Sequence, residues 1–295
     1  MTAPAALERW NGEDVRLADV EAALSKLRAA SAPPGGPPNL RTSVMTHLAW
    51  VPADWQEQAR AALAGMAEQH PSRAILLFPD PDSGLNSIDA DVSLESYAIP
   101  GADRNISSEV IELRLHGMRA KAPASIVEPL LISDLPVFLR WRGEPAWESQ
   151  ELDQLVRITD RLIVDSTEWE DLPYPYTRLA QLFDRTAVSD IAWARTSRWR
   201  TILAGLWPGI VDVRTVRVHG TAAQAHLILG WLRSRLDRPD IALEHVPAER
   251  LEGIDLDGVA VAFPPGDPPL PSDVLSDELD RFTRDPNYEA AVVEV

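Results

Sequence analysis

The sequence predicts an α/β fold of two domains, each a mixed, largely parallel sheet with flanking helices. Short apolar runs typical of buried strands recur along the chain, as at Ala74–Phe78 and Leu135–Leu139. Many of these runs are separated by stretches with helical spacing of apolar residues. Strands that alternate with helices of about 10 to 15 residues indicate crossover connections in a parallel sheet. The 295 residues and 45% hydrophobic content suffice for one large domain or two ordinary ones.

The first 40 residues are predicted to form one helix and a linker. In the helix, Asp19–Ala30, the apolar residues Val20, Leu24 and Leu27 have helical spacing. The linker, Ser31–Pro38, holds four prolines and two glycines, a composition that excludes a regular element. We therefore expect the leading helix to be tethered rather than integral, and to dock either on the body of the protein or on a partner.

Residues 41–171 are predicted to form the N-terminal α/β domain. Two of its strands, Ile88–Ile99 and Ile106–Leu115, alternate apolar and polar residues, which predicts a hairpin. The other predicted strands are Ser43–Val51, Ala74–Phe78, Pro136–Trp141 and Arg161–Asp165, and the predicted helices are Ala53–Gln69, Ala124–Ile132 and Glu148–Ile158.

Residues 172–295 are predicted to form the C-terminal α/β domain, with the boundary near Asp171–Pro175. A strand at Val211–Val218 and a helix at Thr221–Leu236 form its central βα unit. The other predicted helices are Tyr174–Phe183, residues 197–207 and Asp273–Phe282, and the other predicted strands are Ile241–Val246 and Val259–Phe263.

The composition argues against several classes of partner. A net charge of −17 is opposite to the basic field that nucleic-acid binding and docking on anionic lipid both require. No apolar run approaches the ~20 residues of a membrane helix, and the N-terminus lacks a signal-peptide pattern, so we expect a cytoplasmic protein. The chain has no cysteine, which excludes a disulfide, a thiol nucleophile and a thiolate metal site.

Two clusters of arginine and tryptophan are the candidate binding residues. Arg and Trp are enriched at the hot spots of protein–protein interfaces, and ten tryptophans are more than one core normally uses. The predicted partner-binding residues are Arg140, Trp141 and Arg142 at a strand end, and Trp193, Arg195, Arg198, Trp199 and Arg200. The alternative for the second cluster is that both indoles pack inward at a domain junction while the arginines are solvated.

The charge is unevenly distributed along the chain. Residues 193–236 hold seven arginines and one acid, Asp212, whereas residues 237–295 hold four basic and fifteen acidic residues. This basic window, residues 193–236, therefore needs an acidic partner. That partner is either another part of this chain or an external acidic protein or phosphate-bearing ligand.

Few residues suggest catalysis. Asp165 follows a predicted buried strand, where open α/β sheets bind ligands, although a helix cap or an Asx turn explains it as well. Residues 80–91 begin like a calcium loop but lack its glycine and its final glutamate. Neither a phosphate-binding glycine loop nor a nucleophile elbow occurs. We predict no catalytic, cofactor-binding or metal-binding residues.

Several segments between residues 41 and 235 resemble one protein family. They include Arg41–Val44, His70–Arg73, Asp89–Leu94, Ser108–Arg114, Ala122–Pro145, Asp160–Asp165 and Val188–Arg195. In these segments the chain resembles the OpcA family, the glucose-6-phosphate dehydrogenase assembly and activator proteins of actinobacteria and cyanobacteria.

The resemblance implies a function without catalysis or cofactor. It implies that the partner is glucose-6-phosphate dehydrogenase and that the role is to assemble or allosterically activate this enzyme in the oxidative pentose phosphate pathway. The alternative is a sugar-phosphate sensor or an enzyme of the same pathway that uses an arginine cluster as a phosphate clamp.

Overall fold

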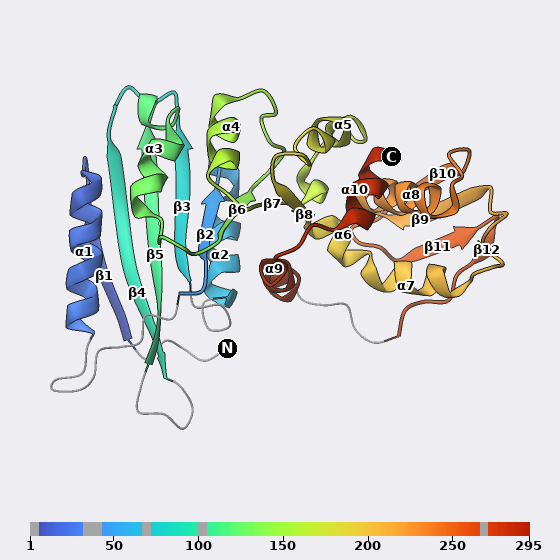
Figure 1. Cartoon of the computed structure of the whole chain (residues 1–295), viewed down its shortest axis with the longest axis horizontal. Helices are drawn as coiled ribbons and strands as arrows, with labels where there is room; N and C mark the ends of the chain where they lie inside the picture. The colour runs from blue at the N-terminus through green and yellow to red at the C-terminus, as the bar shows by residue number, and fades with distance from the viewer. Residues whose placement is uncertain (1–5, 32–42, 67–71, 99–104, 266–270) are drawn as a thin grey trace. The chain divides into compact units, whose positions relative to one another are not determined.

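The computed structural model describes residues 6–31, 43–66, 72–98, 105–265 and 271–295 (Figure 1). The chain divides into two compact units, Met1–Leu162 and Ile163–Val295. It contains an eight-stranded sheet of order β1-β4-β5-β3-β2-β6-β7-β8 and a four-stranded sheet of order β10-β9-β11-β12. The predicted α/β class with two mixed sheets and flanking helices is confirmed.

The strands of the large sheet are β1 (Ala6–Gly12), β2 (Thr46–Trp50), β3 (Arg73–Asp80), β4 (Ile88–Ala98), β5 (Asn105–His116), β6 (Val137–Trp141), β7 (Arg161–Val164) and β8 (Ala187–Asp190). Those of the small sheet are β9 (Thr215–Gly220), β10 (Ala242–Pro247), β11 (Gly253–Leu256) and β12 (Val259–Ala260).

The helices are α1 (Leu17–Ala30), α2 (Gln56–Met66), α3 (Pro123–Val127), α4 (Gln150–Arg157), α5 (Tyr174–Ala180), α6 (Ile191–Arg195), α7 (Ser197–Gly205), α8 (Ala222–Leu236), α9 (Pro271–Leu279) and α10 (Pro286–Val293). Within the described ranges, none of them has both the length and the apolar character that a membrane crossing requires.

Parallel strands β2, β3, β5 and β6 form the centre of the first unit. The strands β2 and β6 are buried along their whole length, because helices cover both faces of the sheet. On one face, Ala59 of α2 packs with Leu76 and Phe78 of β3. The opposite face carries the buried Arg73 and Glu109, which are paired with α1.

Ion pairs tie helices to both faces of this sheet. Arg73 Nε donates to Glu109 Oε2 at 2.8 Å, and Arg28 Nε of α1 donates to Glu109 Oε1 at 2.6 Å. On the other face, Arg60 of α2 makes a bidentate pair with Glu112 of β5. Burial alone would raise the pKa of Glu109, but its bonds to Arg28 and Arg73 lower it below the usual value.

The N-terminal segment corrects one prediction. The predicted hairpin of β4 and β5 is confirmed as an antiparallel pair, but β1 adds to its outer edge, pairing with β4 from Ala6 to Gly12. Helix α1 then buries Val20, Leu24 and Leu27 beside these strands (Figure 1). The leading helix is therefore integral to the first unit. A proline-rich linker separates it from β2 along the chain, and composition alone does not show where it packs. Apart from Ser31, that linker lies outside the described residues.

The second unit has the predicted βα unit at its centre. Strands β9 and β10 are parallel and joined by α8, and β11 and β12 extend the sheet with antiparallel pairs. Helix α8 begins with a capping box between Thr221 and Gln224. It packs closely against α10, and a Cβ built on Gly230 would lie only 2.1 Å from the carbonyl oxygen of Ala291.

Five elements were not predicted from the sequence: β1, β8, α6, β11 and α10. The helix α10 had a recognisable start signal, because Asp285 caps it and Pro286 occupies its first position. Asp190 likewise caps α6. The unit division falls between Leu162 and Ile163, and the predicted boundary near Asp171–Pro175 remains a prediction.

Replacing Gly230 with alanine should destabilise the second unit. The added methyl group meets a backbone carbonyl, which cannot turn aside as a flexible side chain does, so we expect a loss of about 1–3 kcal/mol. Gly205→Ala in α7 is the matched control, because a Cβ there meets no atom within 4 Å. Chemical denaturation of both variants tests this; equal stability of the two would contradict it.

Candidate functional site

The first arginine–tryptophan cluster lies mostly in the core. Trp141 ends β6 opposite Trp50 of β2, and the two rings stack with centroids 5.1 Å apart. Trp141 is only 3% exposed. Arg140 is also buried, and its guanidinium donates to the carbonyl of Trp141. The Trp50–Trp141 stack therefore joins neighbouring strands at their carboxyl ends.

Arg142 is the member of this cluster that reaches the surface. Its backbone N–H donates to the carbonyl of Trp50 at 3.0 Å, and its half-buried guanidinium lies 4.6 Å from the ring centroid of Trp55. The next residue, Gly143, has a φ of +74° and leaves room for the Trp55 indole. Arg142 and Trp55 therefore form a cation–π pair at the carboxyl ends of parallel strands, where α/β sheets commonly bind ligands.

In the second cluster, both indoles pack inward, as the alternative interpretation proposed. Trp193 of α6 donates from Nε1 to Asp285 Oδ2 at 2.9 Å and packs against the ring of Tyr288. Trp199 of α7 is buried edge-on against Phe263, with centroids 5.4 Å apart. Within the second unit, Trp193 therefore joins α6 to α10, and Trp199 joins α7 to the segment after β12.

The arginines of the second cluster occupy three different environments. The Arg200 guanidinium lies over the Trp193 ring, 3.4 Å from its centroid, and burial lowers the pKa of Arg200 to about 10. Arg195 forms an ion pair with Asp165, with a distance of 3.0 Å from Nη1 to Oδ2. Arg198 on α7 is half-buried. Arg200 is half-buried and stacks on a buried tryptophan. Of the predicted partner-binding residues, the half-buried ones without such a stack are Arg142, Arg195 and Arg198.

Asp165 serves both as a cap and as an ion-pair partner. Its carboxylate accepts hydrogen bonds from the backbone N–H and the hydroxyl of Thr167. Asp165 is thereby the N-cap of the short 3-10 helix Ser166–Glu168. The same carboxylate pairs with Arg195. The sequence left a site role and a capping role open, and the capping role is confirmed.

Acids of the second unit neutralise part of the basic window. Arg217 pairs with Glu244 at 2.7 Å and approaches Asp255 at 3.7 Å. Arg233 donates to the carbonyl of Ile241, a neutral acceptor. Acids of the second unit therefore account for Arg195 and Arg217, and Arg214 remains exposed.

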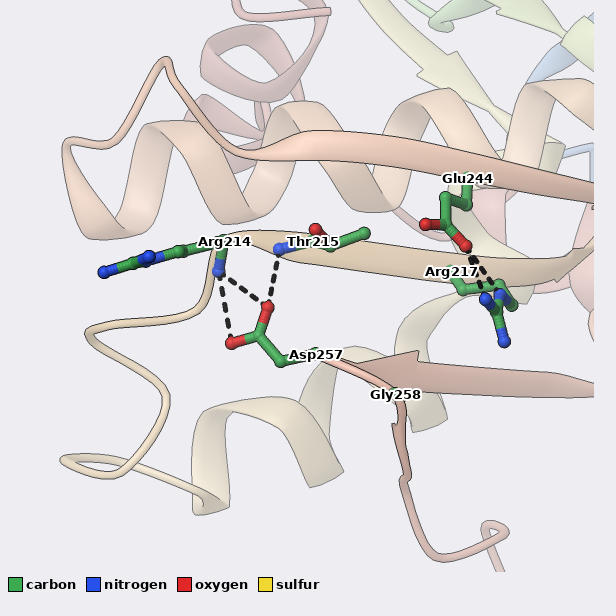
Figure 2. A pocket seen from close by; sticks show the side chains of 6 residues that line it. All are labelled: Arg214, Thr215, Arg217, Glu244, Asp257 and Gly258. Atoms are coloured by element: carbon green, nitrogen blue, oxygen red, sulfur yellow. Dashed lines mark hydrogen bonds and ion pairs between the residues drawn. The ribbon is translucent and has the colours of Figure 1, made fainter.

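A cavity of about 310 Å³ opens at the start of the small sheet. Its lining residues are Arg214, Thr215, Arg217, Glu244, Asp257 and Gly258 (Figure 2). Asp257 and Gly258 form the β11–β12 turn, and the Asp257 carboxylate accepts from the backbone N–H of Thr215 at 2.8 Å. Figure 2 shows the side chain of Arg214 pointing away from the Arg217–Glu244 pair. The two guanidiniums do not converge on one point. The Asp-Gly turn signal in the sequence could have located this cavity.

Trp207 is a candidate that the sequence analysis did not select. It follows α7 inside the basic window and is 64% exposed, next to the exposed Leu206. All ten tryptophans lie in the described ranges, and only Trp207 is exposed. An exposed indole of this kind has the properties of an interface hot spot.

Two models of one family match the chain in order and together cover more than half of it. The first, described as the glucose-6-phosphate dehydrogenase subunit N-terminal domain, matches residues 64–182. The second, described as the C-terminal domain of the same subunit, matches residues 186–268.

Three curated proteins, provisionally named OxPP cycle protein OpcA, are similar to this chain. Identity is 28% over 182 residues with the Synechococcus elongatus protein, 26% over 197 residues with that of Synechocystis and 27% over 187 residues with that of Nostoc punctiforme. The matched regions cover 58%, 62% and 58% of this chain, but only 41%, 40% and 39% of those relatives. The chain therefore spans about two fifths of their length.

Removing Trp199 should cost far more stability than removing Trp207. Trp199→Ala leaves a cavity beside Phe263 and should destabilise the protein by about 3–5 kcal/mol. The exposed Trp207→Ala should change the free energy of unfolding by about 0.5 kcal/mol or less. Denaturation monitored by circular dichroism measures both, and similar losses would show that the packing described for Trp199 is incorrect.

Proposed function

Because the chain belongs to the OpcA family, we propose that it binds glucose-6-phosphate dehydrogenase and promotes the assembly and activity of that enzyme. The observation that carries this proposal is the match of both domain models, in order, to the two halves of the chain. The names of the curated relatives, which refer to the oxidative pentose phosphate cycle, support the same pathway.

Under this proposal the chain acts as a non-catalytic partner. An activator of this kind must bind the active state or oligomer of the enzyme more tightly than the inactive one, because only differential affinity shifts a population. Two α/β units with half-buried guanidiniums at their surfaces suit such a task. The complex would form in the cytoplasm, as the sequence predicts.

The proposed contact residues are those that combine exposure with hot-spot chemistry. In the first unit these are Arg142 and its neighbour Trp55. In the second unit they are Arg195, Arg198 and the exposed Trp207. The buried members of the two predicted clusters would act indirectly by holding these residues in place.

A sugar-phosphate sensor is the second candidate, and the cavity in the small sheet favours it. Two arginines line this cavity, as a phosphate clamp requires. We rank it second because Arg217 already pairs with Glu244 and Arg214 points elsewhere (Figure 2). Melting curves of the chain with glucose 6-phosphate distinguish the two. A shift that is lost in Arg217→Ala would favour the sensor.

Mixing the purified chain with the dehydrogenase tests the proposal directly. We expect a larger complex by size-exclusion chromatography, together with a higher rate or a lower substrate requirement of the enzyme. The chain by itself should show no dehydrogenase or lactonase turnover. Saturable turnover by the chain alone on a pentose-pathway substrate would refute the partner function.

Substitutions at the proposed contacts should weaken this complex without unfolding the chain. Truncation of an interface hot spot costs roughly 2–4 kcal/mol, or about thirty-fold or more in affinity. The test set is Arg142→Ala, Arg195→Ala, Arg198→Ala and Trp207→Ala, measured by dehydrogenase binding and by melting temperature. Arg157→Ala is the control, since this exposed arginine of α4 pairs only within its own helix. Unchanged binding in all four variants would place the docking surface elsewhere.

A further inference from the structure

The carboxylate of Asp190, at the end of β8, is buried in the second unit and accepts four hydrogen bonds. It is 1% exposed. Oδ1 accepts from the backbone N–H groups of Ser166 at 3.1 Å and Ala192 at 2.8 Å. Oδ2 accepts from the Ser166 hydroxyl at 2.6 Å and from the Tyr288 hydroxyl at 3.3 Å. No basic side chain pairs with Asp190 anywhere in the described part of the chain.

The groups around Asp190 favour its neutral form. Burial, followed by the negative charge of Asp165, raises the pKa of Asp190 to about 7, although the bonds from Ser166 and Ala192 oppose the shift. Arg195 of α6 pairs with Asp165 rather than with Asp190. From α5 and α10 the facing titratable groups are the Tyr176 and Tyr288 hydroxyls, whose pKa values burial raises well above the usual range.

More remote charges act on this cluster through its neighbours. Glu278 of α9 raises the pKa of Tyr288 electrostatically. Asp285 accepts from the Trp193 indole and partly opposes the lowering of the Arg200 pKa that burial causes. From α8, the group that faces the cluster is the backbone carbonyl of Ala223, an acceptor for the Tyr176 hydroxyl.

A chain of hydroxyl groups connects Asp190 to that carbonyl. The distance from Asp190 Oδ2 to Ser166 Oγ is 2.6 Å, and from Ser166 Oγ to the Tyr176 hydroxyl it is 2.8 Å. The Tyr176 hydroxyl lies 3.5 Å from the oxygen of Ala223. When Asp190 is ionised, Tyr176 donates to Ser166, and Ser166 donates to Asp190.

The chain can reverse when Asp190 gains a proton. Asp190 then donates to Ser166, Ser166 donates to Tyr176, and Tyr176 donates to the Ala223 carbonyl. Ser166 keeps one donor and one acceptor role in both states, Tyr176 keeps a donor role, and Tyr288 still donates to Oδ2. Both protonation states therefore satisfy the buried polar groups, which a protein interior requires.

We propose that Asp190, Ser166 and Tyr176 form a proton-driven switch that reverses a buried hydrogen-bond chain and sets how firmly α5, α8 and α10 are held together at neutral pH. The direction follows from linkage. Because the pKa of Asp190 is raised above the ~3.9 of an exposed aspartate, the folded chain binds a proton that the unfolded chain has released. This contribution to stability is fully present below about pH 4 and is lost as the pH rises through about 7.

Thermal unfolding between pH 5 and pH 8.5 tests the switch. The melting temperature of the natural chain should fall between pH 5 and about pH 7 and level off above that pH. Asp190→Asn, which is always neutral, should lack this fall. Tyr176→Phe removes the acceptor for the Ser166 proton, disfavours protonated Asp190 and should move the fall to lower pH. Tyr174→Phe is the matched control on the same helix, because that tyrosine is 59% exposed.

An infrared measurement keeps the test decisive if Asp190→Asn fails to fold. The natural chain should show the band of a buried protonated carboxylic acid at pH 5, and this band should disappear as the pH rises through about 7. A natural chain without that band, an Asp190→Asn variant with an unchanged pH slope, or equal midpoints for Tyr176→Phe and Tyr174→Phe would each overturn the proposal.

Discussion

A polar group taken out of water must find its partner inside the protein, and this constraint organises both units of the chain. In the first unit, Arg73 and Glu109 lie on adjacent parallel strands, and Arg28 brings α1 onto the same carboxylate. In the second unit, Asp190 collects donors from the segment after β7, from α6 and from α10. Leaving such a group unpaired costs about 1–3 kcal/mol or more, so these contacts specify which elements meet.

The same constraint explains the arginine–tryptophan clusters. A buried indole needs an acceptor for its N–H, and Trp193 finds one in Asp285, 92 residues away in sequence. A buried guanidinium needs acceptors or an aromatic face, and Arg200 lies over Trp193. A composition that is typical of interfaces therefore also arises where helices must be joined through polar side chains. Exposure distinguishes the two cases: Trp193 is buried, whereas Trp207 is exposed.

Under the proposed function, this arrangement separates the frame from the proposed contact residues. The Trp50–Trp141 stack fixes the strand ends from which Arg142 projects. Asp165, which caps the turn after β7, holds Arg195 in place at the surface of the second unit. Such preorganised side chains lose less conformational entropy on binding, which strengthens the differential affinity that an activator needs. A proton held at Asp190 would change the frame without touching the surface residues.

The sequence by itself determined the kinds of elements, their approximate bounds and the family. Hydrophobic periodicity is a local property, so it located the β4–β5 hairpin and the β9-α8-β10 unit, and the absence of cysteine excluded thiol chemistry without any structure. Local motifs in segments such as Val188–Arg195 likewise supported the family resemblance. Short elements such as β8 and α6 were missed because four or five residues are too few to show a period.

Only the tertiary structure decided which side chains are exposed and which polar groups meet. Trp141 is buried because the register of β6 places it opposite Trp50, 91 positions earlier in the chain. Asp190 has a raised pKa because other elements bury it and place the charge of Asp165 nearby, and these effects outweigh the hydrogen bonds from Ser166. β1 joins the sheet by pairing with the edge of β4, and no local pattern in the sequence predicts that pairing. Burial and pairing depend on contacts between residues distant in sequence, so periodicity and composition predict the elements but not their neighbours.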